Sequence, residues 1–329
     1  MQSSSTLFPV ALLSAERRGD LSEDVYRIKA GNGPDPSVEL ALTRLGLADQ
    51  GQPLGVPVIL LHGSFSNRRF WYSPKGVGLG AYLARAGFDV WIPEMRGHGL
   101  SPRNHAWQHN NVAAYARDDL PLIAAFVREQ SGQAPHWIGH SLGGTTLAAA
   151  LGGGFLAAGE VASVALFGTQ ISRVYWPLKV PPLAWGAKLV LKRWGRFPGH
   201  VSSVDQRTSP SAWRWRACAG TACSGALATS RATGGRGWQR WMCRCWRWPA
   251  RGTSRTRCGP AESCSSSWGE RKQFLRLGRE EGFDAFGHVD MLVSKAAQVQ
   301  VWPLVERWLR NPLLPVHASA VAVEPLPAS

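Results

Sequence analysis

The sequence lacks any long run of strongly apolar residues. The closest candidate, the uncharged stretch from 141 to 159, consists largely of Gly, Ala and Thr, whereas a membrane-spanning helix needs about 20 mostly apolar residues. The N-terminus, MQSSSTLFPVALLSAERRGD, also lacks the basic segment that precedes the apolar run of a secretory signal peptide. We therefore expect neither a transmembrane helix nor a signal peptide, and we predict a cytoplasmic protein.

Charged residues are scarce, at 18% of the chain, while hydrophobic residues make up 44%. This composition is too apolar for a disordered protein and allows a sizeable core. The length of 329 residues is enough for one large domain or two small ones.

Acidic residues are almost missing from one stretch, residues 206–269. This stretch holds 11 Arg, one Glu and no Lys or Asp, so it contributes +10 to a formal net charge of +15. The rest of the chain together carries only +5. A basic protein can bind nucleic acid, but here that function would depend on a single segment, so we regard it as the weaker alternative.

The same stretch lacks Val, Ile, Phe and Tyr, and it has a single Leu. From this composition we expect neither a normal strand nor a packed aliphatic core. It also contains seven of the 16 Trp and all six Cys, at positions 218, 223, 243, 245, 258 and 264. The cysteine spacings match no zinc motif and none of the nine His falls inside, so we predict no metal site.

Three interpretations of this segment compete: a cysteine-rich module, a basic aromatic tail that binds nucleic acid, and out-of-frame translation of GC-rich DNA. The genetic code favours the third. If each codon starts at the last base of the preceding one, residues 242–253 can become Asp-Val-Pro-x-Leu-Ala-x-Ala-Gly-x-Gly-Asp. An apolar run that ends in Gly and a carboxylate is typical of a buried parallel strand. We place the anomalous segment at about 201–269.

Elsewhere, predicted strands and helices alternate along the chain. We expect strands at 58–61, 88–92, 136–138, 161–167 and 273–277, and helices at 79–86, 111–130, 142–151, 289–297 and 299–310. This order predicts an α/β fold with a mostly parallel sheet covered by helices on both faces. We expect an N-terminal extension (1–25), a core (26–170 and 270–310) and a disordered tail (311–329).

The motif that carries chemistry is Gly139-His140-Ser141-Leu142-Gly143, which follows a predicted strand and precedes a predicted helix. In this context a G-x-S-x-G sequence indicates a nucleophile elbow, a sharp turn that exposes the serine hydroxyl above the sheet. The turn also places Ser141 at the positive end of the following helix. We predict that Ser141 is a nucleophile.

A serine hydroxyl needs a base, and His288 follows the last predicted strand, far downstream of Ser141 in the chain. We expect the amides of Ser64 and Leu142 to form an oxyanion hole, with Phe65 as the alternative to Ser64. Structural roles are expected for His62 and His98, and Asp118 and Asp119 are expected to be solvated or structural.

These residues resemble the α/β-hydrolase superfamily. The resemblance rests on His62-Gly63, Glu94-x-Arg-Gly-His-Gly99, the 139–143 elbow and Gly287-His288. Three further segments, 70–74, 87–91 and 119–121, resemble acid-lipase-type and related bacterial hydrolases. The resemblance implies an esterase or lipase with ester or lipid substrates, no metal and no organic cofactor.

The sequence departs from this family at the triad acid. The family places an Asp after the strand that precedes the last one, upstream of the catalytic histidine, and here that window holds Thr253 and Thr256. Asp284 and Asp290 are too close to His288 in the chain, and Glu94 would make an unusual triad. The chain therefore has a nucleophile and a base, but no acid in the expected position.

The resemblance also implies a cap over the active site at 171–200. This segment holds three Trp, four Leu and six basic residues but no acidic residue. An amphipathic cap predicts peripheral contact with an anionic membrane, and a cap helix with a solvated basic face is the equal alternative.

We predict a serine hydrolase that cleaves carboxylic esters through an acyl-serine intermediate. The first alternative is an α/β-hydrolase product impaired by the loss of its acid. The second is a protein that binds nucleic acid through residues 206–269.

Overall fold

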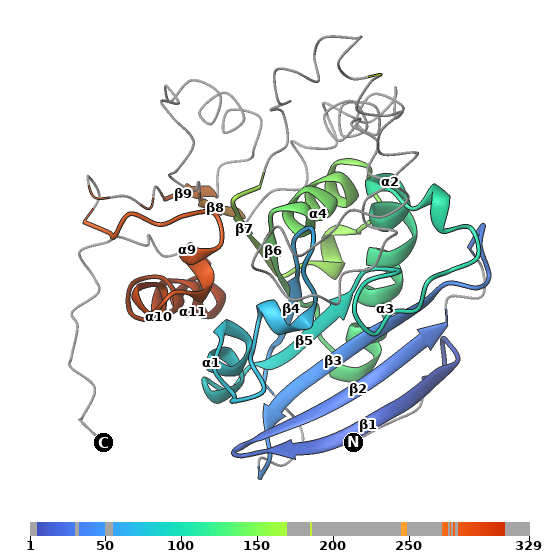
Figure 1. The fold of residues 1–329 in the computed structure, drawn as a ribbon, viewed down its shortest axis with the longest axis horizontal. Helices are drawn as coiled ribbons and strands as arrows, with labels where there is room; N and C mark the ends of the chain where they lie inside the picture. The colour runs from blue at the N-terminus through green and yellow to red at the C-terminus, as the bar shows by residue number, and fades with distance from the viewer. Residues whose placement is uncertain are drawn as a thin grey trace.

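The computed structural model describes residues 5–29, 33–49, 55–169, 185, 245–248, 272–275, 277, 279 and 282–312. These residues form one twisted sheet with helices packed on both of its faces (Figure 1). The α/β class and the mostly parallel sheet are as predicted. The predicted cap, apart from residue 185, and the predicted disordered tail beyond residue 312 lie outside the described residues.

The sheet has nine strands in the order β1-β2-β3-β5-β4-β6-β7-β8-β9. The strands are β1 (Val10–Arg18), β2 (Leu21–Lys29), β3 (Glu39–Leu47), β4 (Pro57–Leu61), β5 (Asp89–Glu94), β6 (His136–His140), β7 (Ser163–Phe167), β8 (Cys245–Trp248) and β9 (Lys272–Phe274). Strands β1, β2, β3 and β5 pair antiparallel, and the pairs from β5 to β9 are parallel. The carboxyl ends of β4, β5, β6 and β7 therefore meet along one edge of the sheet.

The N-terminal residues belong to the sheet. Residues 1–25 were expected to be an N-terminal extension, but β1 and most of β2 lie in that range and pair antiparallel, with one irregularity between Leu12 and Ser14. The chain reverses between them at Gly19, whose φ of +65° suits glycine. The structure corrects this boundary because β2 buries Leu21, Val25 and Tyr26 against the rest of the fold.

Strand β8 corrects a second expectation. The composition of residues 206–269 predicted no strand, yet Cys245–Trp248 pairs in parallel with β7 on one side and with β9 on the other. Main-chain hydrogen bonds build a ladder and do not depend on side-chain type. The strand falls within the 242–253 window where the alternative reading frame would encode an apolar strand, and the rest of residues 201–269 lies outside the described residues.

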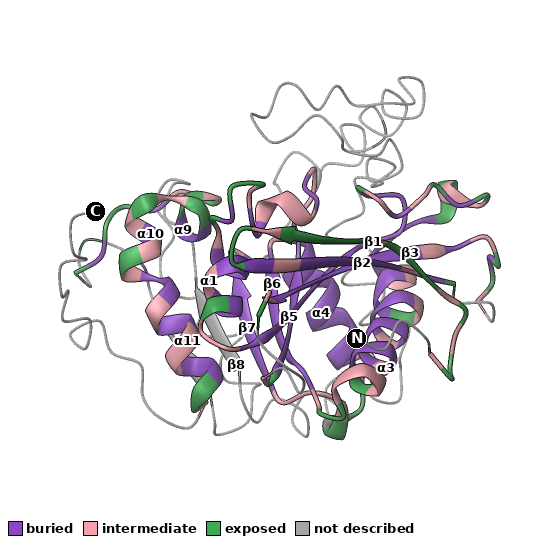
Figure 2. Ribbon diagram, turned by 90° about the horizontal axis from the view of Figure 1, so that it is seen from below, coloured by how far each residue is buried: buried purple, intermediate pink, exposed green. Residues whose placement is uncertain are grey.

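Two apolar cores cover the two faces of the sheet. Because side chains alternate along a strand, Val58 and Leu60 of β4 enter one core while Ile59 and Leu61 enter the other. The first core is closed by α1 (Leu79–Arg85), α9 (Asp290–Val293), α10 (Lys295–Gln300) and α11 (Trp302–Arg310). The second is closed by α2 (Val112–Ala114), α3 (Leu120–Ser131) and α4 (Leu142–Gly152). Figure 2 shows that the central strands are buried whereas β1 has many exposed positions.

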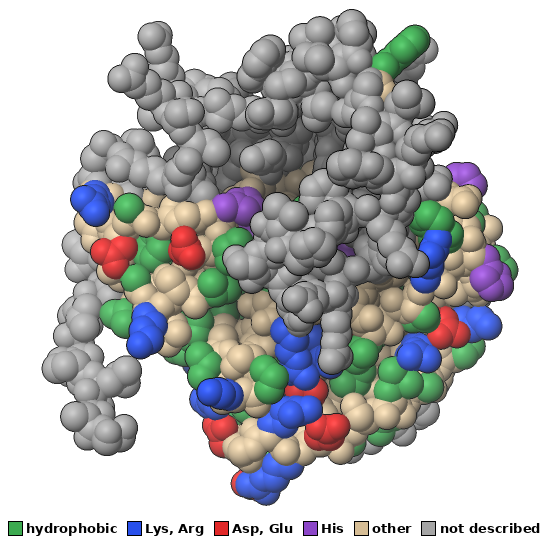
Figure 3. All heavy atoms as spheres, viewed as in Figure 1, with side chains coloured by type: hydrophobic (Ala, Val, Ile, Leu, Met, Phe, Trp, Pro, Cys, Tyr) green, Lys and Arg blue, Asp and Glu red, His purple; other side chains and the backbone are tan. Residues whose placement is uncertain are grey.

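The surface of the described residues carries both signs of charge. Figure 3 shows acidic and basic side chains interspersed over the described part of one face. In the part of the chain that the structure describes, no helix is both long and apolar enough to cross a bilayer.

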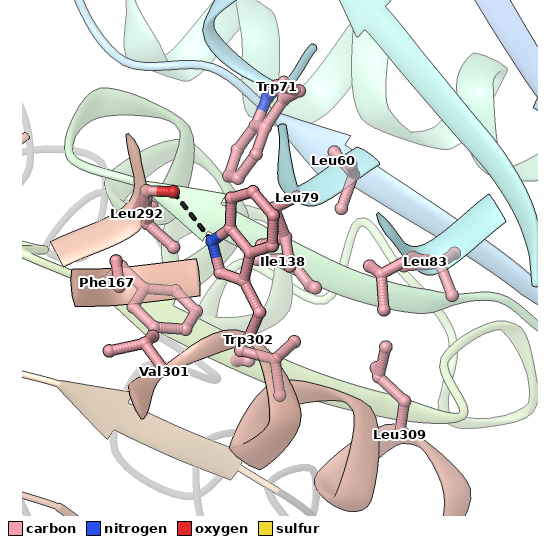
Figure 4. Packing of buried hydrophobic residues seen from close by; sticks show 14 of the residues in the cluster. Leu60, Trp71, Leu79, Leu83, Ile138, Phe167, Leu292, Val301, Trp302 and Leu309 are labelled. Carbon is pink, nitrogen blue, oxygen red and sulfur yellow. Dashed lines mark hydrogen bonds between the residues drawn. The ribbon is translucent and has the colours of Figure 1, made fainter. Parts of the chain in front are cut away.

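Trp302 joins the last helices to the first core. Its indole lies among Trp71, Leu79 and Phe167 (Figure 4). The indole Nε1–H donates to the Leu292 carbonyl at 2.8 Å, so this large ring is buried without leaving its polar atom unpaired. The contact ties α11 to α9, directly after the segment that carries His288.

The helix predicted at 111–130 has three parts. Asn111 caps its start by accepting a hydrogen bond from the Ala114 amide at 3.0 Å. A π-helical turn, η3 (Tyr115–Asp119), follows α2, and α3 begins just before Pro121. The wider turn accommodates the proline, which could not donate within a continuous α-helix. It also places Asp119 in a buried ion pair with Arg96, whose Nε lies 2.9 Å from the carboxylate.

A second buried ion pair joins β3 to β5. Arg44 donates to both carboxylate oxygens of Asp89, at 2.7 and 2.9 Å. The Trp91 indole N–H donates to the same carboxylate at 2.9 Å. Both charged side chains are almost fully buried, so each charge depends on its partner for compensation.

We expect Asp89→Asn to lower the free energy of unfolding by about 3 kcal/mol or more, because it removes the carboxylate that is hydrogen-bonded to the buried Arg44 guanidinium. The exposed pair between Arg85 and Asp20 is the matched control, and Asp20→Asn should cost at most about 1 kcal/mol. Urea unfolding measures both. Equal losses in the two variants would contradict the assignment of Arg44 and Asp89 as a structural link.

Candidate active site

Ser141 lies at the turn between β6 and α4. Its φ of 51° and ψ of −113° are unfavourable for a residue with a side chain. The Ser141 amide donates to the Phe167 carbonyl of β7 at 2.9 Å, which fixes the turn at the carboxyl edge of the sheet. Among the described residues other than glycine, positive φ occurs at Ser141 and Phe65. Such strain is concentrated at functional sites.

The glycines of the motif allow α4 to approach the sheet closely. A Cβ on Gly139 would lie 2.6 Å from the Gly144 Cα, and a Cβ on Gly143 would lie 2.5 Å from the Leu61 carbonyl oxygen. Both distances are too short for a side chain. The small residues are therefore required by the contact of α4 with β6 and β4.

The chain after β4, residues 62–70, lies beside the turn. A Cβ on Gly63 would be 3.2 Å from the Ser141 Cβ, so the backbone there touches the nucleophile. The chain then turns sharply at Phe65, with a φ of 59°. The Ser64 and Phe65 amides lie in this turn. Leu142 is the first residue of α4, so its amide has no acceptor within the helix. The oxyanion role of these three amides stays a prediction.

His62 holds this loop in place. Its Nδ1–H donates to the Gly63 carbonyl at 2.8 Å, and its Nε2 accepts from the Met95 amide at 3.2 Å. These two bonds specify the neutral tautomer with the proton on Nδ1. The ring is fully buried, and burial lowers the pKa of His62 to about 4. His62 is therefore a structural residue that connects the loop to the end of β5.

Glu94 anchors the same loop. Its carboxylate is 1% exposed and accepts from the Arg68 amide at 3.0 Å and from the Leu100 amide at 2.9 Å. A Cβ on Gly99 would collide with this carboxylate, which explains the glycine there. All of these contacts lie within the loops after β4 and β5, so Glu94 does not serve as the third member of a triad.

The His288 side chain lies beside the residue that follows β7. Strand pairing sets His140 opposite Phe167, which puts Ser141 level with Gly168. A Cβ on Gly168 would be 2.8 Å from both Cε1 and Nδ1 of His288, so the imidazole rests on the Gly168 backbone. Loss of water from part of the ring lowers the pKa of His288. Ser141 and His288 are therefore neighbours, although the hydrogen bonds among the described residues do not join the Ser141 hydroxyl to the imidazole.

His140 is a site residue that sequence reasoning missed. Its Nε2–H donates to the His288 carbonyl at 2.9 Å, and its ring stacks on Phe70 with centroids 4.6 Å apart. Its only sequence signal was its place beside the nucleophile, at a position that the G-x-S-x-G motif leaves free. Only the packing of three loops reveals it.

Four residues bear on the triad acid, two carboxylates near His288 in the chain and two threonines at the expected position of the acid. Asp284 accepts from the Gln300 side chain at 3.3 Å, and Asp290 is exposed in the first turn of α9. Thr253 and Thr256 lie outside the described residues. Within the described ranges, no carboxylate is hydrogen-bonded to His288, and no cluster of three His, Cys, Asp or Glu could hold a metal ion.

The remaining polar residues singled out in the sequence lie away from this turn. Asp119 is buried with Arg96, and Asp118 accepts from Arg117 at 2.8 Å. His98 is buried beside His62, with ring centroids 5.0 Å apart. Burial, reinforced by His62, lowers the pKa of His98 to about 3.

Comparison with known proteins agrees with this geometry. A family model described as the alpha/beta hydrolase fold matches residues 56–191, which include the elbow. The chain has the α/β-hydrolase fold. It is similar along 96% of its length to a monoglyceride lipase structure from Saccharomyces cerevisiae, of which it covers 99%, with a TM-score of 0.60 and 11% identity. A peroxisomal alpha-beta-hydrolase from the same yeast matches 95% of the chain, covers 93% of that protein and gives a TM-score of 0.55 at 12% identity.

The sequence relatives are lipases, and each match covers a limited segment of this chain. Lipase member N of Mus musculus is 36% identical over 121 residues, which are 32% of this chain and 30% of the relative. Gastric triacylglycerol lipase of Bos taurus is 36% identical over 103 residues, which are 27% of this chain and 25% of the relative. The chain thus spans less than a third of the length of these two relatives.

Three buried histidines near the loops should make stability depend on pH. The pKa values of His62, His98 and His140 are lowered to about 4, 3 and 3, whereas an unfolded histidine titrates near about 6.5. Below that pH the unfolded chain binds more protons than the folded chain. The contribution of these histidines to the free energy of unfolding is therefore complete above about pH 6.5 and is lost as the pH falls toward their pKa values in the folded state.

We expect the free energy of unfolding to decrease between pH 7 and pH 5, and to decrease less in His98→Phe. The difference in slope should approach about 1.4 kcal/mol per pH unit below pH 6.5 for one titrating group. Urea unfolding at several pH values measures both slopes. Parallel curves for the two proteins would show that His98 is not kept neutral by burial.

Proposed function

We propose that the chain is a serine hydrolase that cleaves carboxylic esters through an acyl-serine intermediate, with lipid or small apolar acyl esters as substrates. The observation that carries the proposal is the strained Ser141 turn between β6 and α4, with the His288 imidazole resting on the adjacent Gly168. The similarity of a segment of the chain to lipases supports the substrate class.

In this mechanism the Ser141 Oγ attacks the ester carbonyl while His288 accepts the hydroxyl proton. The carbonyl oxygen becomes an oxyanion, which the amides of Leu142 and of Ser64 or Phe65 stabilise at the positive end of α4. His288 then donates its proton to the departing alcohol oxygen. Water attacks the acyl-serine by the same route in reverse and releases the acid and Ser141.

A catalytically impaired hydrolase is the second candidate. It is favoured by the sequence, which has Thr253 and Thr256 where the α/β-hydrolases carry the triad acid. A triad carboxylate keeps the histidine in the correct tautomer and stabilises the imidazolium. The cytoplasmic localisation and a membrane contact through residues 171–200 stay predictions.

We expect Ser141→Ala to abolish ester hydrolysis and covalent labelling by a fluorophosphonate, because no other nucleophile occupies the elbow. Intact-protein mass spectrometry detects the adduct. His105→Ala, at an exposed position on another loop, is the control that should label like the unaltered chain. Labelling that survives Ser141→Ala unchanged would remove Ser141 as the nucleophile.

The absence of an acid at the expected position in the sequence predicts low activity. A version that carries the alternative reading frame across 206–269 should have a higher kcat/KM on a short p-nitrophenyl ester, by up to about 10⁴-fold, the loss observed when a triad acid is removed from a serine protease. The rates are compared per phosphonate-titrated active site, so that unfolded protein does not count. Equal rates would show that the chain as written orients His288 by other means.

A further inference from the structure

His140 contacts all three parts of the candidate site. It precedes the nucleophile, and a Cβ on Gly63 would lie 2.9 Å from its Nδ1, so the ring also touches the oxyanion loop. Phe70 stacks on it at 4.6 Å, with the two rings 19° from parallel. The His288 ring lies 4.7 Å from it, centroid to centroid. One buried ring therefore lies between the loop after β4, the elbow and the segment that carries the base.

The hydrogen bond from His140 acts on the backbone of the base. The carbonyls on either side of His288 accept hydrogen bonds from amides of α9: Gly287 accepts from the Met291 amide and Val289 accepts from the Leu292 amide. The His288 carbonyl instead accepts the Nε2–H of His140 at 2.9 Å. This bond fixes the backbone of His288 at the point where the chain enters α9.

His140 can donate in this way only as one neutral tautomer. A carbonyl oxygen cannot donate, so the proton must be on Nε2 and the Nδ1 is an unprotonated acceptor. That Nδ1 is buried without a hydrogen-bond partner. Burial, with the nearby His288, lowers the pKa of His140 to about 3. A neutral ring beside His288 does not oppose the imidazolium that forms there during acyl transfer.

We propose that His140 is a positioning residue, which anchors the backbone of the base His288 to the nucleophile elbow through its Nε2–H. The inference rests on the proposed function of Ser141 and His288. The hydrogen bond from His140 then helps to orient His288, whose imidazole is bonded to no carboxylate among the described residues.

Two substitutions separate the donor from the ring. His140→Phe keeps the aromatic stack on Phe70 and removes the hydrogen bond. His140→Gln places an amide N–H at nearly the reach of Nε2 and removes the ring. The matched control is His136→Phe, at the other end of β6, where a buried histidine contacts the Ser163 hydroxyl at 2.6 Å, far from the elbow.

The first measurement is the second-order rate constant for phosphonylation of Ser141, from pH 5 to pH 9, per folded molecule. We expect His140→Phe to lower it roughly 10- to 100-fold, the effect of misplacing a catalytic group by about 1 Å. His140→Gln should retain most of the rate, and His136→Phe should retain all of it. A rate for His140→Phe equal to that of the unaltered chain would overturn the proposal.

The second measurement needs no activity. NMR titration of the His288 ring, assigned with a His288→Asn variant, should show its pKa moving toward the ordinary histidine value in His140→Phe but not in His140→Gln. An unaltered chain that is never phosphonylated would refute the proposed function, and the titration would still decide the role of His140. Identical His288 titrations in all variants would refute that role.

If His140→Phe does not fold, His140→Asn replaces it. Its amide is one bond shorter than that of glutamine and cannot reach the His288 carbonyl. Slower phosphonylation, or a shifted His288 pKa, in His140→Asn than in His140→Gln is the expected result. Equal behaviour of the two amide variants would overturn the proposal.

Discussion

The hydrogen bond from the Ser141 amide to the Phe167 carbonyl is the contact on which the candidate site depends. It fixes a residue of positive φ at the carboxyl edge of the sheet, between β6 and β7. From that point α4 starts in contact with the end of β4, where Gly143 leaves no room for a side chain. The same register sets Gly168 beside the nucleophile, and His288 rests on Gly168. The proposed nucleophile, amide donors and base thus lie on neighbouring stretches of backbone.

Buried polar side chains hold the loops around this region. Glu94 accepts backbone amides from two loops, and His62 joins the end of β5 to the loop after β4. Burying a carboxylate is costly unless it is hydrogen-bonded and paired, and here two amides and the Arg68 guanidinium compensate it. Burying a histidine costs little when it stays neutral. The site therefore obtains fixed loops without placing an uncompensated charge near the reacting atoms.

The described part of the site is asymmetric. The proposed nucleophile and amide donors lie on residues 62–70 and 139–143, within the segment matched by the α/β-hydrolase family model. The base lies on residues 282–289, outside that segment, and reaches the elbow through His140 and Gly168. Strand β8, between β7 and β9, continues the sheet across a sequence whose composition does not favour strands. Ladder pairing on both edges accounts for this, because the backbone bonds are the same for every residue except proline.

The sequence alone determined the fold class, the strand–turn–helix around Ser141 and the positions of most central strands. These features depend on local spacing: apolar runs of strand length, glycines around a serine, and helices between them. Strand β1 was not predicted because Val10–Arg18 is a largely exposed edge strand without a buried apolar pattern. Strands β2 and β3 were not predicted, although most of their residues are buried, because charged residues such as Glu23, Asp24 and Arg44 interrupt their apolar runs. The partners of Glu94 and the part played by His140 were decided by tertiary structure. Each of these side chains contacts residues distant in the chain, such as His288, 148 positions from His140, and no local pattern records which loops meet when the sheet closes.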